Sequence, residues 1–356
     1  MKWSIRITTS LLILILTATV VAAQAKSNLS SSSPASSSAF ESKEIKFNGV
    51  NVLLAGTLLL PKLEAGKRAP AVLIIAGSRS TPRDGLTFGS VKQLIYRDLA
   101  EYLAARGYVI LRYDKRCVGA SQCVKPTSFD DYIEDARGAV NYLREHPQVD
   151  KKRIFLFGHS EGGLIAATIG SHEDQGLAGV ILAAMPGRTL GKLMREQIQN
   201  RMTEAGKSAK EISDFTAKYD RVIRGLTSGH ADFSGEKLDE KDPFDALLTG
   251  LIKQSEIVIS LLINDPLQIV NNIKYPALVL QGRKDVQVAV KDAEYIEEAM
   301  KRAEHHDATT HVLDDVDHLL KTNKGAAGLS SYEDASRPLD VNLLAILTEW
   351  MQKRAE

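Results

Sequence analysis

The stretch that decides the fold is Gly158-His159-Ser160-Glu161-Gly162-Gly163, which follows the apolar run 154–157 and precedes the helix-like stretch 164–168. Glycines two residues before and two residues after the serine allow the chain to turn sharply from a strand into a helix without a steric clash. Such a nucleophile elbow holds the serine hydroxyl beside a helix N-terminus, where backbone N–H groups and the helix dipole stabilise negative charge. The setting predicts that Ser160 is a nucleophile, and the alternative is a glycine-rich turn with an incidental serine.

Strand-like and helix-like segments alternate along the chain after Pro61. The strand-like runs are 71–76, 109–113, 154–157 and 180–184, and the helix-like segments are 91–106, 129–145 and 161–170. This alternation is typical of a mostly parallel sheet with helices on both faces, in which reacting groups gather at the carboxyl ends of the strands. Before it, the extended segments 44–47 and 52–60 flank Asn48-Gly49 and predict an antiparallel hairpin.

The alternation stops after Pro186, and the next strand of this kind is 277–280. A structureless loop of about 90 residues is improbable in a compact domain, and the apolar residues between these points recur at helical spacing. We therefore predict a helical cap over 187–270, inserted into a core formed by 43–186 and 271–356. Helix starts are expected at Asp242-Pro243 and Asp265-Pro266, and the core resumes with helix 290–302, strand 309–313 and helix 341–353.

The first 25 residues have the pattern of a secretory signal peptide. Lys2 and Arg6 precede a short apolar run, and Ala23-Gln24-Ala25 forms a small-residue cleavage site. An uncleaved membrane anchor is the competing interpretation, but the apolar run is short for a membrane span. Residues 26–42 are rich in serine and predict a disordered linker. The sequence thus predicts an exported protein, periplasmic or secreted, with no stable membrane insertion after cleavage.

Charge and cysteine content narrow the functional classes. Cleavage after Ala25 leaves 43 basic and 44 acidic residues, a balance that gives nucleic acid no electrostatic attraction. Cys117 and Cys123 are the two cysteines, and in an oxidising compartment a close pair predicts a small-loop disulfide. Two free thiols in a loop are the alternative. Two cysteines are too few for a metal site, and no zinc motif is present, so we expect neither metal nor other cofactor.

A serine nucleophile needs a base, and the base needs an acid that fixes its tautomer, in the chain order Ser, Asp or Glu, His. Asp285 stands just past the strand that ends near Gln281, where a carboxylate can reach a histidine above the sheet; a helix-capping aspartate is the alternative. Among eight histidines, His318 lies in the loop after the last strand, whereas the side chain of His159 should point away from the serine. The oxyanion donors are expected to be the N–H groups of Ser78 and Glu161.

Together these residues resemble the bacterial α/β-hydrolases of the serine aminopeptidase-like and dienelactone hydrolase-like branch. Besides the elbow, the resemblance rests on segments 75–78, 83–85, 113–119, 281–285 and 317–321. It implies an α/β-hydrolase fold with nucleophile, acid, base and oxyanion donors at the positions derived above. This chain departs from the family at Cys117, where glycine is usual, and at Arg79, where a small residue is expected.

The sequence predicts a serine hydrolase that cleaves the carboxylic ester of a small-molecule acyl substrate through an acyl-enzyme. Ester cleavage is favoured because an alkoxide leaving group demands less acid assistance than an amine. A peptidase or aminopeptidase-like amide hydrolase is the close alternative. A protein of this fold that binds a ligand without turnover is the alternative from another class.

Overall fold

The computed structural model describes residues 39–355, except 79, 89, 127, 173–175, 230–232 and 234 and the side chain of residue 255. The signal peptide predicted over 1–25, the linker as far as 38, and Arg79 lie outside the described residues. The first strand begins at Phe40, so residues 40–42 of the expected linker are extended chain within the sheet. In the part of the chain that is described, no helix combines the length and apolarity needed to cross a membrane.

The core is an eight-stranded sheet in the order β1-β2-β6-β3-β7-β8-β9-β10. Its strands are β1 (Phe40–Gly49), β2 (Val52–Pro61), β3 (Ala69–Ile75), β6 (Val109–Tyr113), β7 (Val149–His159), β8 (Gly179–Ala183), β9 (Ala277–Gly282) and β10 (Ala308–Leu313). β2 is antiparallel to both of its neighbours, and the pairs from β6 to β10 are parallel. This topology confirms the predicted mostly parallel sheet with an N-terminal hairpin.

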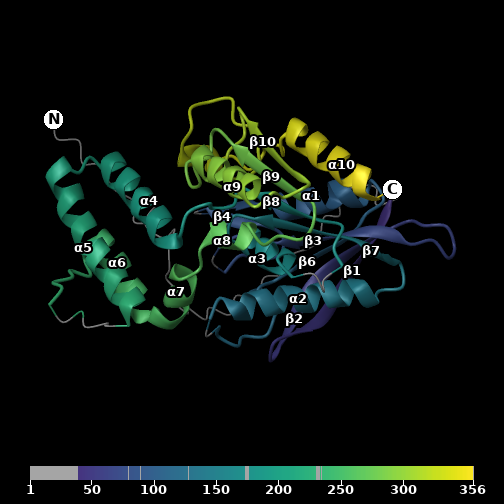
Figure 1. Ribbon diagram of the computed structural model, residues 1–356, viewed down its shortest axis with the longest axis horizontal. Helices are drawn as coiled ribbons and strands as arrows, with labels where there is room; N and C mark the ends of the chain where they lie inside the picture. Colours follow the sequence, from purple (N-terminus) through teal and green to yellow (C-terminus); the bar gives the residue numbers. More distant parts are fainter. Residues whose placement is uncertain are drawn as a thin grey trace.

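Helices cover both faces of the sheet (Figure 1). One apolar layer packs under α1 (Ile95–Ala104) and α10 (Val341–Ala355), and the other under α2 (Asp130–Glu145), α3 (Glu161–Gly170) and α9 (Val290–Arg302). The central strands are buried on both sides, because alternate residues of β3 enter opposite layers. The loops at the carboxyl ends of the parallel strands therefore share one edge of the sheet.

The predicted hairpin turn and the predicted helix over 91–106 each differ from the structure at one boundary. Gly49 pairs with Val52, so the hairpin turn consists of Val50 and Asn51. Asn51 adopts the left-handed conformation (φ 54°) that asparagine tolerates, whereas a Cβ on Gly49 would lie 2.2 Å from a carboxylate oxygen of Asp135.

The other displaced boundary is the helix expected over 91–106. Its first residues form β5 (Val91–Gln93), which pairs with β4 (Leu86–Phe88) in a separate two-stranded ribbon. Helix α1 therefore begins at Ile95, after the ribbon ends.

The helical cap has its own apolar core and extends to one side of the sheet (Figure 1). It contains α4 (Leu190–Glu204), α5 (Ala209–Ser228), α6 (Pro243–Lys253) and α7 (Ser255–Leu262). The carboxylate of Asp242 accepts hydrogen bonds from two backbone N–H groups at the start of α6, as predicted. Helix α8 (Pro266–Val270), although predicted to belong to the cap, packs on the core, where Val270 is fully buried.

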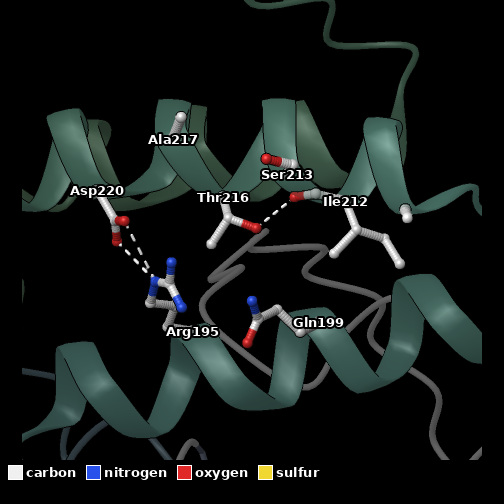
Figure 2. Close-up of a pocket in the computed structure, with 8 residues that line it drawn as sticks. Arg195, Gln199, Ile212, Ser213, Thr216, Ala217 and Asp220 are labelled. Carbon is white, nitrogen blue, oxygen red and sulfur yellow. Dashed lines mark hydrogen bonds and ion pairs between the residues drawn. The ribbon is translucent and has the colours of Figure 1, made fainter.

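A groove of about 460 Å³ lies in the cap between α4 and α5 (Figure 2). Arg195 of α4 and Asp220 of α5 form an ion pair across it, and both polar and apolar side chains, such as Gln199 and Ile212, line the remainder. None of its lining residues belongs to the elbow or to the loops that carry Asp285 and His318. We therefore regard the groove as a feature of the cap and describe the candidate site at the sheet edge.

Polar contacts attach the cap to the core close to Asp285. Arg188 forms ion pairs with Asp292 of α9 at 2.7 Å and with Glu196 of α4 at 2.9 Å. The side-chain amide of Gln197, also on α4, donates to the backbone carbonyl of Gln287 at 2.8 Å. The start of the cap is thus fixed to the segment that follows Asp285.

The predicted disulfide is present and joins Cys117 to Cys123 in the loop after β6. Cys117 has a φ of 63°, a left-handed conformation that glycine adopts without steric cost. This backbone requirement accounts for the glycine that the resembling family usually has at this position.

The backbone conformation at Cys117 leads to a ranking of two disulfide-free variants. We expect Cys117→Ser/Cys123→Ser to lower the free energy of unfolding by about 2 kcal/mol, because the closed loop restricts the unfolded chain. Cys117→Gly/Cys123→Ser should be more stable than the serine pair by about 1 kcal/mol, because glycine relieves the left-handed strain. Urea unfolding of the three proteins measures both differences. A glycine variant no more stable than the serine pair would contradict the explanation.

Candidate active site

Ser160 occupies the strained turn between β7 and α3, with φ 55° and ψ −122°. Tight packing enforces the turn: a Cβ on Gly158 would lie 2.2 Å from the carbonyl oxygen of Gly162, and a Cβ on Gly162 would lie 2.2 Å from that of Ile75. The backbone N–H of Ser160 donates to Ala183 of β8 at 2.8 Å, while its hydroxyl does not cap α3. The strand, turn and helix of the predicted elbow are therefore present, and the hydroxyl is not engaged as a cap.

Asp285 and His318 come together above the sheet edge. Asp285 lies in the turn after β9 and His318 in the loop after β10, and His318 Nδ1 is 2.8 Å from Asp285 Oδ2. The other carboxylate oxygen accepts the backbone N–H groups of Gln287 at 2.8 Å and Val288 at 2.9 Å. Because a carboxylate oxygen accepts, Nδ1 of His318 carries the proton and Nε2 is left as the acceptor. This is the tautomer that a general base requires.

The nucleophile and the histidine loop are joined through the neighbouring residue. His159 precedes Ser160, and its Nε2 donates to the backbone carbonyl of His318 at 2.7 Å. The rings of His159 and His318 lie 4.8 Å apart, centroid to centroid. Among the described residues, no hydrogen bond joins the Ser160 hydroxyl to the His318 ring, and such bonds are often long before a substrate binds.

The predicted oxyanion donors lie on the two segments beside the nucleophile. A Cβ built on Gly77 would be 3.3 Å from Cβ of Ser160, so the loop after β3 contacts the elbow directly. Ser78 follows in this loop, and its carbonyl accepts the hydroxyl of Thr81 at 2.7 Å. Glu161 is the first residue of α3, where a backbone N–H has no acceptor within the helix. The two donors can therefore face a substrate oxygen from different segments.

A buried chain of hydrogen bonds runs behind the site. The N–H of Gly77 donates to the hydroxyl oxygen of Tyr96 at 2.8 Å, and this hydroxyl lies 2.8 Å from Nδ1 of His159. Since His159 Nε2 donates to the His318 carbonyl, Nδ1 must accept from the tyrosine hydroxyl. His159 and Tyr96 thus link the loop after β3, which carries the predicted donor Ser78, to the backbone of His318. The sequence does not predict this supporting role.

Burial keeps the side chains of His159 and Tyr96 neutral. Desolvation is the largest effect on His159; together with the nearby His318, it lowers the His159 pKa to about 3, against the opposing bond to the His318 carbonyl. Desolvation also raises the pKa of Tyr96 well above its usual value. A neutral imidazole and a neutral phenol maintain one direction of hydrogen bonding across the ordinary working range of pH.

Comparisons with known proteins agree with this architecture. The family described as serine aminopeptidase, S33, matches residues 92–223, a segment that includes Ser160 and ends before Asp285. Esterase EstD from Thermotoga maritima is 29% identical over 321 residues, which cover 88% of this chain and 68% of the relative. This chain is a member of the α/β-hydrolase superfamily. It is an enzyme of the serine hydrolase class.

Solved α/β-hydrolases have the same fold at low sequence identity. An esterase from Pyrococcus furiosus aligns with a TM-score of 0.55 at 18% identity, covering 89% of this chain and 92% of the other. An acylaminoacyl peptidase from Pyrococcus horikoshii aligns with a TM-score of 0.54 at 16% identity, covering 90% of this chain and 42% of the other. Among the described residues of this chain, no cluster of three or more His, Cys, Asp or Glu side chains is arranged to hold a metal ion.

The low pKa of His159 predicts a specific loss of stability in acid. An unfolded histidine binds a proton below about pH 6.5, whereas the folded His159 resists protonation down to about pH 3, so stability falls as the pH drops through this window. His159→Gln preserves one donor and one acceptor without titrating. Between pH 7.5 and pH 5, the native protein should lose about 2 kcal/mol more unfolding free energy than the variant. Urea unfolding at both values checks this, and parallel losses would show that His159 is not the cause.

Proposed function

We propose that this protein is an exported serine hydrolase that cleaves carboxylic esters through an acyl-enzyme. The observation that carries the proposal is the hydrogen bond between Asp285 and His318, made beside the strained Ser160 elbow. Ser160 attacks the acyl carbon while His318 Nε2 takes its proton and Asp285 holds the opposite ring nitrogen. The N–H groups of Ser78 and Glu161 bind the oxyanion, His318 protonates the leaving alcohol, and water releases the acid.

The charges beside the nucleophile favour an ester over a substrate with a free amino terminus. Glu161 is paired with Lys115 at 2.9 Å, and Asp285 is bonded to His318. An aminopeptidase needs a carboxylate that is available to pair with the α-ammonium of its substrate, and these two are already engaged. A neutral acyl group requires no such partner, so the engaged carboxylates support ester hydrolysis of a small molecule.

An amide hydrolase without amino-terminal specificity is the second candidate, and the fold shared with an acylaminoacyl peptidase supports it. Parallel assays with 4-nitrophenyl esters of increasing acyl length and with acylaminoacyl anilides distinguish the two. Faster turnover of the anilides than of every ester would replace the ester proposal with the amide one.

The triad proposal predicts the behaviour of Ser160→Ala. Removal of the hydroxyl should lower kcat for a 4-nitrophenyl ester on the order of 10⁵-fold or more, because no acyl-enzyme can form. A fluorophosphonate probe should label the native protein at Ser160, and peptide mass spectrometry locates the adduct. Ser213, exposed on the cap and away from the elbow, provides a control, and Ser213→Ala should retain native turnover. A native protein that the probe leaves unlabelled would instead favour ligand binding without turnover.

Export is proposed from the amino-terminal pattern, and the disulfide between Cys117 and Cys123 supports an oxidising compartment. Expression of the full chain in a bacterial host should give a protein that begins at Lys26, recovered outside the cytoplasm. Intact-mass measurement of each cell fraction checks the cleavage. An uncleaved chain in the membrane fraction would identify the segment as an anchor.

A further inference from the structure

Lys115 is a buried cation directly behind the candidate oxyanion site. It follows β6 by two residues, and it is only 3% exposed. Its ammonium donates to the backbone carbonyl of Gly77 at 2.6 Å and to the carboxylate of Glu161 at 2.9 Å. It also lies over the ring of Tyr132, 5.2 Å from the centroid. The mechanism above assigns Lys115 no part in the chemistry.

The bond to Gly77 acts on the peptide group that carries one oxyanion donor. The carbonyl of Gly77 and the N–H of Ser78 belong to one peptide unit, and no cis bond occurs in the described chain. In a trans peptide the C=O and N–H point in opposite directions, so a fixed carbonyl fixes the direction of the Ser78 N–H. On the other side of Gly77, its own N–H is held by Tyr96 at 2.8 Å. The two peptide groups that flank Gly77 are thus each held by a hydrogen bond.

The bond to Glu161 reaches the residue that carries the second donor. Glu161 follows the nucleophile and begins α3, whereas Gly77 belongs to the loop after β3. One ammonium group therefore joins the two segments whose N–H groups converge on the oxyanion. The bond to Gly77 is buried and the bond to Glu161 is partly buried, and charge-assisted hydrogen bonds that are shielded from water are strong.

We propose that Lys115 is a positioning residue that assembles the oxyanion hole by orienting the Gly77–Ser78 peptide and joining it to the first turn of α3. The ammonium also polarises the peptide through its carbonyl, which makes the Ser78 N–H a better donor. Glu161 balances the lysine charge, so the site gains oriented donors without a net positive charge. This inference rests on the proposed serine hydrolase function and extends it to a residue that does not touch the substrate.

The test compares Lys115→Met, Lys115→Gln and a matched control. Lys218 of the cap also bonds a carboxylate, that of Asp245 at 2.7 Å, and a backbone carbonyl, that of Lys237 at 3.3 Å. Lys218→Met removes the same kinds of bond away from the elbow. With a 4-nitrophenyl ester, Lys115→Met should lower kcat about 10- to 100-fold and change KM less than twofold, because a misplaced donor affects the transition state most. Lys115→Gln can still donate to the carbonyl and should retain intermediate activity.

A transition-state analogue separates a positioning role from general destabilisation. A boronic acid forms a tetrahedral adduct on the serine, and its inhibition constant should rise in Lys115→Met by the same factor as kcat/KM falls. Lys218→Met should retain native kcat and native boronate affinity, and thermal unfolding shows that each variant is folded. If Lys115→Met does not fold, Lys115→Gln provides the test. Its kcat should be lower than that of the native protein, and its inhibition constant for the boronic acid should be higher.

The outcomes distinguish this inference from the function on which it rests. Suppose that the probe labels the native protein and that a folded Lys115→Met variant has undiminished kcat. This result overturns the role of Lys115 and leaves the proposed function standing. A Lys115→Gln variant with kcat no higher than that of the methionine variant, or with native kcat, also overturns it. A native protein that the probe does not label at Ser160 overturns the proposed function and this inference with it.

Discussion

The close approach of the first turn of α3 to the end of β3 is the constraint on which the rest of the site depends. A Cβ on Gly162 would come within 2.2 Å of the carbonyl oxygen of Ile75, so a side chain there would push the helix away from the strand. The same approach places Gly77 against the elbow and holds Ser160 in a conformation that an unconstrained chain would leave. Packing of bare backbone therefore positions both the Ser160 turn and the neighbouring loop after β3, which carries a predicted oxyanion donor.

Buried polar bonds then determine the orientations that packing leaves open. Tyr96 and His159 connect the oxyanion loop to the carbonyl of His318, and Asp285 holds the ring of the same histidine. Each of these groups would be costly to bury without its partner. Alternative arrangements of the loop after β3, the turn that carries Asp285 and the loop that carries His318 are therefore disfavoured. The sheet supplies the positions of the loops, and the hydrogen bonds orient the His318 ring and the loop after β3.

The sequence predicts those features whose causes are local. The glycine spacing around Ser160, the Asp-Pro helix starts and the helical repeat of the cap all depend on neighbours within a few residues, and the structure agrees with them. The sequence misplaces the hairpin turn because close packing against Asp135, 86 residues away, accounts for Gly49, and the turn does not. The sequence assigns helix α8 to the cap because its apolar residues do not reveal which core they join. Lys115 lies within segment 113–119, but the sequence assigns it no role because both of its partners come from distant segments.

The Lys115–Glu161 pair also connects oxyanion geometry with the charge of the substrate. A substrate ammonium at this point would have to compete for Glu161 with a lysine that is already held by a second bond and desolvated. An uncharged acyl group meets no such competition and needs only the oriented N–H donors. The ion pair that we propose organises the two segments of the oxyanion hole would thereby oppose substrates with a free amino terminus, and this supports the proposed ester hydrolysis.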